Sequence, residues 1–166
     1  MNDLAQKKLD ELIALFDTAM LVTTSLRGKP RARPMAIAGH HEGGLLYFAT
    51  RAEDEKLEEV LQQPDVAVTF QEGQRFLSIS GQARVETDVQ LARELWKPAM
   101  KLWFPDGARD PQLTLILVEP TYAEYWDRSG VRRLEFLWEA GKALVRGELP
   151  EVERRDMHAK VRPGQR

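Results

Sequence analysis

The chain has 166 residues, of which 43% are hydrophobic and 30% charged, and its formal net charge is −2. This length and composition predict one soluble globular domain with a single core. The sequence has no cysteine, which excludes disulfides, thiolate metal sites and thiol nucleophiles. The charge offers no general field for nucleic acid, and no apolar run approaches the ~18 residues of a membrane span. Charges interrupt the apolar N-terminal residues, so we expect no signal peptide and a cytoplasmic protein.

The first half of the chain predicts one helix followed by three strands. Apolar residues at helical spacing over 4–16 predict an amphipathic helix. Extended segments rich in β-forming residues follow at residues 19–24, 31–38 and 45–50. Gly and Pro in the intervening segments predict tight turns. The third of these strands is apolar enough to be buried on both faces.

The second half predicts further strands with short helices between them. Helical spacing is found over residues 53–62, over 91–102 with a break at Pro98, and over 134–145. Strands are expected at 66–70, at 76–86 and over 113–126, the last being one long strand or a bent pair interrupted by Pro120. Five or six strands, the early ones joined by tight turns, predict a mainly β protein with flanking helices, an antiparallel barrel rather than a doubly wound sheet.

The domain is expected to span residues 1–150. Residues 151–166 are rich in charge and predict a tail that is poorly ordered or draped on a partner.

No pattern in the sequence predicts a catalytic side chain or a metal site. His40 and His41 are adjacent in a predicted turn, where both cannot easily face one metal ion. The acids of 53–55 and 58–59 fall in the first turns of a predicted helix, where they complement the helix dipole. Motifs typical of zinc proteases, serine hydrolases, P-loops and dinucleotide-binding domains are absent from the sequence.

A basic group falls at one end of the predicted sheet. Arg31 and Arg33 alternate along a strand and therefore point to the same side. Thr50 and Arg51 end the next strand, and Lys56 follows on the short helix. If the two strands pair, these donors converge near the helix N-terminus, where a phosphate would gain charged and backbone hydrogen bonds. From the residues alone, solvated surface charges are the favoured interpretation of this basic group.

Several segments, taken in order, carry a resemblance to a known family. They are Arg31–Ala36, Leu46–Thr50, Lys56, Asp65–Phe70, Trp103–Gly107, Glu124–Trp126 and Lys142–Gly147. Their order and spacing resemble the FMN-binding split barrel of the pyridoxamine 5′-phosphate oxidase superfamily, with Greek-key-like strand connections. The last three segments resemble the general stress protein branch of that superfamily. The resemblance covers roughly residues 5 to 150.

The resemblance implies a cofactor site at the basic group. Arg33 and Lys56 would bind the phosphate of FMN, with Thr50 and Arg51 beside them.

The rest of the implied site concerns the flavin ring. The main chain of Pro34, Met35 and Ala36 would run along the ring edge. Trp126 would approach from the second subunit of a homodimer, although an aromatic residue at a strand end is as often packed in a core or an interface. The flavin would carry the chemistry, so the resemblance implies cofactor-binding residues and no catalytic ones.

Departures from the oxidase pattern narrow the expected function. Asp54 and Glu55 stand where the oxidase has a serine and an arginine, and Ala38 stands where it has a lysine. The histidine that reads the vitamin phosphate corresponds to Leu134, or to Glu135 after a one-residue shift. A leucine offers no donor and a carboxylate would repel a substrate phosphate, so we expect no authentic pyridoxamine phosphate oxidase.

Three functions remain open from the sequence. The first is a flavin-dependent oxidoreductase with a stress or redox role, with FMN as its cofactor and FAD as the alternative. The second is a flavin-binding store or sensor without turnover. The third is a flavin-free interaction module that docks a partner through its charged tail.

Overall fold

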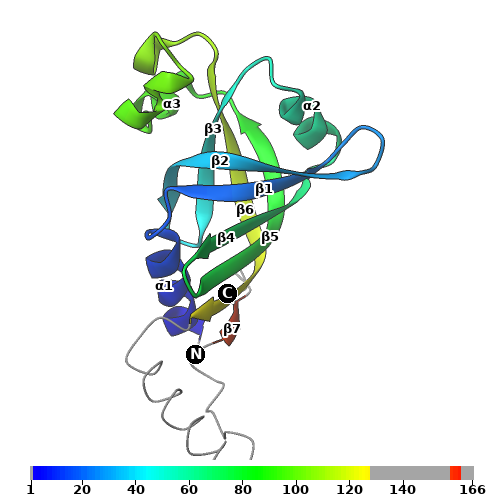
Figure 1. Ribbon diagram of the computed structural model, residues 1–166, viewed down its shortest axis with the longest axis vertical. Coiled ribbons are helices and arrows are strands. Elements are labelled where there is room, and N and C mark those ends of the chain that lie inside the picture. Colours follow the sequence, from blue (N-terminus) through cyan, green and yellow to red (C-terminus); the bar gives the residue numbers. More distant parts are fainter. Residues whose placement is uncertain (1, 128–157, 162–166) are drawn as a thin grey trace, which may run out of the picture.

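A single antiparallel sheet closes on itself to form a barrel, as the computed structural model shows (Figure 1). The structure describes residues 2–127 and 158–161. The strands are β1 Thr18–Thr24, β2 Pro30–His41, β3 Leu45–Arg51, β4 Asp65–Glu72, β5 Arg75–Glu86, β6 Leu113–Asp127 and β7 His158–Val161. The helices are α1 Asn2–Ile13, α2 Glu55–Gln62 and α3 Val89–Glu94, with 3-10 turns η1 Pro98–Leu102 and η2 Gly107–Arg109.

The strand order explains the closure. The sheet runs β3-β2-β1-β4-β5-β6-β7, and β3 also pairs with β6, so six strands form a closed ring. Every pairing is antiparallel. The predicted mainly β barrel with few helices is therefore confirmed.

The long strand β6 joins two parts of the sheet. Its first half pairs with β3, from Leu113 to Val118, and its far end pairs with β7, from Ala123 to Trp126. The sequence left one long strand or a bent pair open here, and the structure has one strand. The partner strand β7 comes from residues 151–166, for which the sequence predicts a tail that is poorly ordered or draped on a partner. The predicted helical stripe over 134–145 lies outside the described residues.

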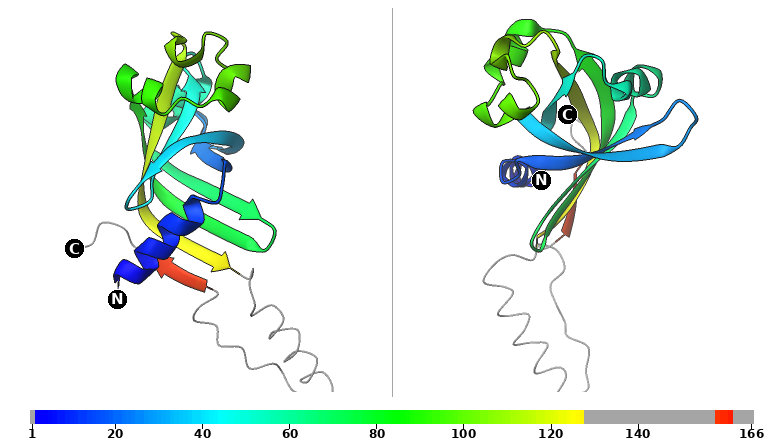
Figure 2. Two further views of the ribbon diagram at one scale, coloured as in Figure 1. Left: turned by 90° about the vertical axis from the view of Figure 1, so that its left-hand side faces the viewer. Right: turned by 45° about the horizontal axis from the view of Figure 1, so that its top comes forward.

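Two layers of apolar side chains cover β3, as its sequence predicts. Leu46 and Phe48 belong to the barrel core, together with residues of α1 and α2. Tyr47 on the opposite face packs in a second cluster with Met100 and Phe104, from the segment between α3 and β6. Figure 2 shows this segment outside the barrel wall, and shows α1 and α2 well apart from one another.

Two of the predicted helices differ from the structure in their bounds. The helix expected over 91–102 ends at Glu94, and Pro98 starts a separate 3-10 turn because its fixed φ suits a first helical position. The helix expected from Glu53 begins at Glu55. No helix in the described part of the chain is long and apolar enough to cross a membrane.

Gly81 marks a bulge at which β5 passes close to β6. The register between these strands shifts between Ser80 and Gly81. A Cβ atom built on Gly81 would lie 2.4 Å from the main-chain oxygen of Glu119. Main chain cannot move aside as a side chain can, so this position requires glycine.

We therefore expect Gly81→Ala to lower the free energy of unfolding by about 1–3 kcal/mol, because it overpacks a main-chain contact. Gly39→Ala is the matched control, since its added Cβ meets the flexible end of Leu95 at 2.7 Å. Urea denaturation of the two variants measures the difference. Equal losses of stability would contradict the close approach of β5 and β6.

Candidate functional site

The two arginines of β2 point to the same side, as the strand alternation predicts. Both reach α2, which lies beside the start of β2 (Figure 1). Arg31 Nη1 lies 2.8 Å from Glu55 Oε2 and 3.2 Å from Glu59 Oε1. Arg33 donates from Nη1 to Glu59 Oε2 at 2.8 Å and from Nη2 to Glu59 Oε1 at 3.0 Å. Arg33 thus makes a bidentate ion pair with the Glu59 carboxylate through its two terminal nitrogens.

Glu59 is a fully buried carboxylate, with none of its side chain exposed. Besides Arg33, it accepts a hydrogen bond from the hydroxyl of Thr23 on β1, which in turn accepts one from Arg33 Nη1 at 2.7 Å. The hydrogen bond from Arg33 lowers the pKa of Glu59 despite the opposing effect of burial. The same bond raises the pKa of Arg33. These three side chains form one closed network between β1, β2 and α2.

A second cluster lies where β3 ends and α2 begins. Lys56 Nζ donates to Thr50 Oγ1 at 3.0 Å and also pairs with Asp54 Oδ2. Thr50 Oγ1 donates to the same Asp54 oxygen at 2.7 Å, and the main-chain N–H of Arg51 donates to it at 3.3 Å. The Lys56 side chain is only 12% exposed, so it is not a solvated surface charge. An ammonium, a hydroxyl and an amide therefore converge on one anionic oxygen.

Asp54 precedes α2 but does not cap it. An aspartate at this position usually accepts hydrogen bonds from the first amides of its helix. Here no side-chain cap is formed, and the carboxylate turns toward β3 instead. Burial raises the pKa of Asp54, but hydrogen bonds from Lys56 and Thr50 outweigh it, so the net pKa is lowered. The first turn of α2 keeps amides that no side-chain cap engages.

Residues 34–36 in the middle of β2, which the resemblance places along the flavin ring, pair with only one strand in the described pairing. Pro34, Met35 and Ala36 pair with β1, through Met20, Ala19 and Thr18. The ladder between β2 and β3 begins at Ile37 and Phe48, so the described pairing leaves the segment 34–36 unpaired on its β3 side. Main-chain groups along that edge thus have no strand partner in the described pairing.

The side chains of Arg51 and Trp126 lie apart from the donors at Asp54. The Arg51 side chain turns away and donates to the main-chain oxygen of Trp103 at 3.2 Å, although its amide is in the cluster. Trp126 pairs with Phe76 near the far end of β6, whereas Thr50 pairs with Thr114 near its start. Twelve residues of strand separate these positions, or ~40 Å. One chain therefore does not bring Trp126 to the site.

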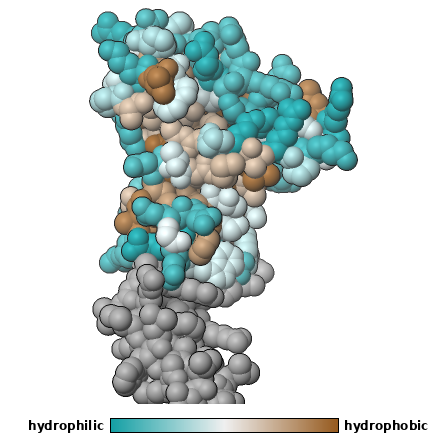
Figure 3. Space-filling view, in the orientation of Figure 1, coloured by the Kyte–Doolittle hydropathy of each residue, from teal (hydrophilic) through white to brown (hydrophobic). Residues whose placement is uncertain are grey.

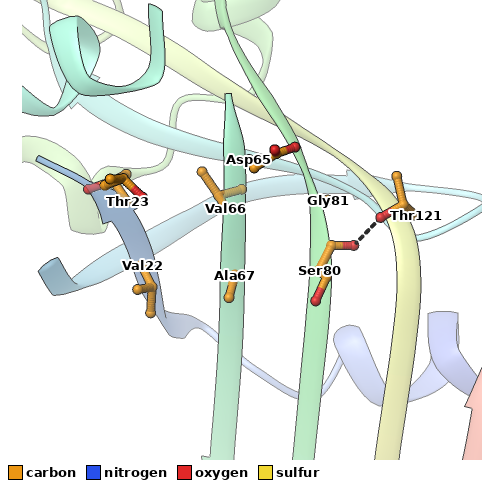
Figure 4. Close-up of a pocket in the computed structure, with 9 residues that line it drawn as sticks. Val22, Thr23, Asp65, Val66, Ala67, Ser80, Gly81 and Thr121 are labelled. Atoms are coloured by element: carbon orange, nitrogen blue, oxygen red, sulfur yellow. Dashed lines mark hydrogen bonds between the residues drawn. The ribbon is translucent and has the colours of Figure 1, made fainter. Parts of the chain in front are cut away.

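A hollow of about 340 Å³ lies elsewhere on the sheet, between β1, β4, β5 and β6 (Figure 4). It is lined by Val22, Thr23, Thr24, Asp65, Val66, Ala67, Ser80, Gly81 and Thr121. Figure 4 shows the hydrogen bond, 3.1 Å long, from the Thr121 hydroxyl to the main-chain oxygen of Ser80. Among the residues predicted to bind the cofactor, none lines this hollow.

Sequence reasoning missed the burial of Glu59 and its contact with Arg33. It placed the acids of α2 at the helix dipole, but Glu59 is buried, whereas apolar Leu61 is 71% exposed. The signal available in the sequence was the position of Glu59 between Leu57 and Val60, two apolar residues predicted to face the core. Residues 2–127 and 158–161 contain no group of three or more His, Asp or Glu side chains placed to hold a metal ion.

Arg33→Met should strongly destabilise the fold. It leaves a buried carboxylate without its main partner, which costs about 3 kcal/mol or more. Replacing both partners, as Arg33→Met with Glu59→Leu, should restore most of that loss because no buried charge remains. Urea denaturation of the two single variants and the double variant gives the coupling. Strictly additive effects would show that the pair is energetically unimportant.

Stability should also fall in acid because the pKa of Glu59 is lower in the folded state. This contribution is complete above the unfolded pKa of about 4.3 and is lost as the pH falls through the folded pKa. Asp54 adds a loss of the same sign. Unfolding free energies between pH 3 and 6 should therefore decline less steeply in the Arg33→Met, Glu59→Leu variant than in wild type. If the unfolding free energies of the two proteins declined equally with falling pH, Glu59 would not be a source of the acid sensitivity.

Comparisons with known proteins identify the family. Residues 5–151 match the family model described as "Pyridoxamine 5'-phosphate oxidase like". General stress protein 26 of Bacillus subtilis is 29% identical over 124 residues, which is 72% of this chain and 85% of that protein.

Solved structures agree on the fold. A general stress protein 26 homologue from Jannaschia sp. CCS1 superposes with a TM-score of 0.73 at 24% identity, covering 98% of this chain and 99% of that one. The general stress FMN/FAD binding protein of Xanthomonas citri has a TM-score of 0.64 at 28% identity, covering 75% and 89%. With a closed antiparallel barrel and a family match over nearly its whole length, the chain belongs to the pyridoxamine 5′-phosphate oxidase-like family of split-barrel proteins.

Proposed function

We propose that the protein binds FMN and that the FMN phosphate lies at the start of α2. The observation that carries this proposal is the convergence of the Lys56 ammonium, the Thr50 hydroxyl and the Arg51 amide on one carboxylate oxygen. A donor set that already holds an anionic oxygen fits a phosphate oxygen as well. The uncapped first turn of α2 adds amides and a favourable dipole.

Arg33 supports the same end of the site. Its Nη1 and Nη2 atoms hold Glu59, while Nε has no protein acceptor in the described part of the chain. One guanidinium edge, on a side chain 25% exposed, is therefore open to a ligand. Arg33 contacts Glu59 of α2, and Lys56 at the start of the same helix contacts Asp54, so the two clusters share α2.

The flavin ring would follow the open edge of β2 at Pro34, Met35 and Ala36, whose main-chain groups have β1 on one side. This arrangement positions the ring by main chain, which is rigid within the barrel wall. Bound FMN would supply the electron transfer, and the residues of this chain would bind and orient it.

The partner's Trp126 would complete the site in a homodimer. Support comes from the distance that separates Trp126 from Thr50 within one chain. Met20 and Phe76 on the sheet are also 37% and 39% exposed. Figure 3 shows mostly hydrophilic side chains over α2 and the upper end of the molecule, with a few brown groups among them, and a paler surface with brown groups over the sheet below. An apolar sheet surface of this kind is suited to a second subunit.

The function that follows is a flavin-dependent oxidoreductase of the cytoplasm with a redox or stress role. The X. citri relative is described as an FMN/FAD binding protein, so FAD is the alternative cofactor. An authentic pyridoxamine phosphate oxidase is not proposed, because Leu134 and Glu135 cannot replace the substrate-reading histidine. Both residues lie outside the described part of the chain.

A flavin-binding store or sensor is the second candidate. It is favoured by Asp54, whose carboxylate occupies the donors that a tightly held phosphate would need. Rapid bleaching of the bound flavin by NADH or NADPH would identify an oxidoreductase. Slow reduction by every donor would identify a binding protein.

Lys56→Met should lower the affinity for FMN by about tenfold or more, because a charge-assisted bond to phosphate contributes roughly 1.5–3 kcal/mol. Affinity for riboflavin, which has no phosphate, should be unchanged. Lys29→Met is the control, since it removes the same charge from an exposed turn. Fluorescence quenching of each flavin measures both affinities. Protein that leaves the absorbance of added FMN unperturbed would overturn the proposal.

A further inference from the structure

Asp54 has the contacts of a bound anion rather than those of a helix cap. One of its oxygens, Oδ2, accepts from Thr50 Oγ1, from the Arg51 amide and from Lys56 Nζ. The side chain makes no capping hydrogen bond to α2, although it occupies the residue position at which aspartate usually does so. The carboxylate therefore fills the place where the donors of the proposed phosphate site meet.

We infer that Asp54 is a built-in competitor that determines which anions the cofactor site accepts. This inference rests on the proposed function, because it concerns the donors assigned to the FMN phosphate. An incoming phosphate needs the Lys56 ammonium, the Thr50 hydroxyl and the Arg51 amide, and Asp54 holds all three. Ligand binding then exchanges one anion for another.

The neighbouring acids do not share this role. Glu55 pairs with Arg31 at 2.8 Å and its side chain is 59% exposed. Glu53 accepts a hydrogen bond from Gln112 at 3.1 Å. Of the acids at residues 53–55, Asp54 is the one that contacts the site donors. Its side chain is 38% exposed, so the carboxylate has solvent to turn into when a ligand displaces it.

Displacement by this route favours one class of ligand. Asp54 is tethered beside its donors, so its effective concentration there is far higher than that of any free carboxylate in solution. A free carboxylate offers no bond that Asp54 does not already make. A phosphate monoester carries up to two negative charges and three terminal oxygens, which can engage Lys56, Thr50 and the α2 amides together. The site should therefore admit phosphate monoesters and reject carboxylates.

The decisive variant is Asp54→Asn, which keeps the shape of the side chain and removes its charge. Affinity for FMN should rise about tenfold, as expected when about 1.4 kcal/mol of competing charge-assisted bonding is removed. Affinity for riboflavin should not change, because riboflavin has no phosphate. A rise of similar size for both flavins, or no rise for FMN, would overturn the inference.

Glu55→Gln is the matched control for general electrostatics. It removes the same charge one residue away without touching the donors. At 0.15 M salt, screening should limit its effect on FMN affinity to about twofold. If Glu55→Gln strengthens FMN binding as much as Asp54→Asn, the effect is a field effect and the competitor role of Asp54 is wrong.

Inorganic phosphate separates this inference from the proposed function. The Lys56 Nζ resonance, followed by NMR in each protein, should shift at lower phosphate concentration in Asp54→Asn than in wild type. If it does so while neither protein binds FMN, the competitor role stands and the flavin proposal fails. The opposite outcome is that wild type binds FMN through Lys56 while Asp54→Asn leaves the affinities for FMN and for inorganic phosphate unchanged. In that case the flavin proposal stands and the competitor role fails.

Discussion

The buried carboxylate of Glu59 fixes α2 against the barrel, and the rest of the site depends on it. Arg33 and Thr23 reach it from two neighbouring strands, so one side chain joins β1, β2 and α2. A buried charge is tolerated only when its hydrogen bonds are satisfied, and this network satisfies them. The start of α2, and with it Asp54 and Lys56, is thereby held beside the end of β3.

Closure of the barrel fixes the other half of the site. Thr50 lies opposite Thr114 on β6, and Arg51 lies opposite Leu113, so the end of β3 is held by the pairing that completes the ring. The hydroxyl and the amide thus come from a strand, whereas the ammonium comes from a helix pinned by Glu59. Donors carried on rigid elements lose little conformational freedom when a ligand binds, which favours recognition of a small anion.

Local pattern and family resemblance together anticipated much of this arrangement. Alternation along β2 put Arg31 and Arg33 on one side, and the step from Thr50 to Lys56 correctly placed those two side chains in contact. The partner of Arg33 was missed because it lies 26 residues away, a separation that no local periodicity reports. On α2, Glu59 is buried and Leu61 is exposed because Arg31 and Arg33 on β2 bind the Glu59 carboxylate. The face that α2 turns to the barrel therefore differs from the one that its apolar residues predict.

The charges of the two clusters also constrain how a phosphate would bind at the proposed site. The ion pairs join three cations, Arg31, Arg33 and Lys56, to three carboxylates, Asp54, Glu55 and Glu59. These charges balance, so the pairs themselves provide no net positive field to attract an anion from a distance. In the proposed site, binding would instead come from short-range exchange at the donors. Glu59 is fully buried and cannot leave, whereas Asp54 is 38% exposed and can. The same region therefore holds one carboxylate that fixes α2 and one that, in the proposed site, a phosphate would replace.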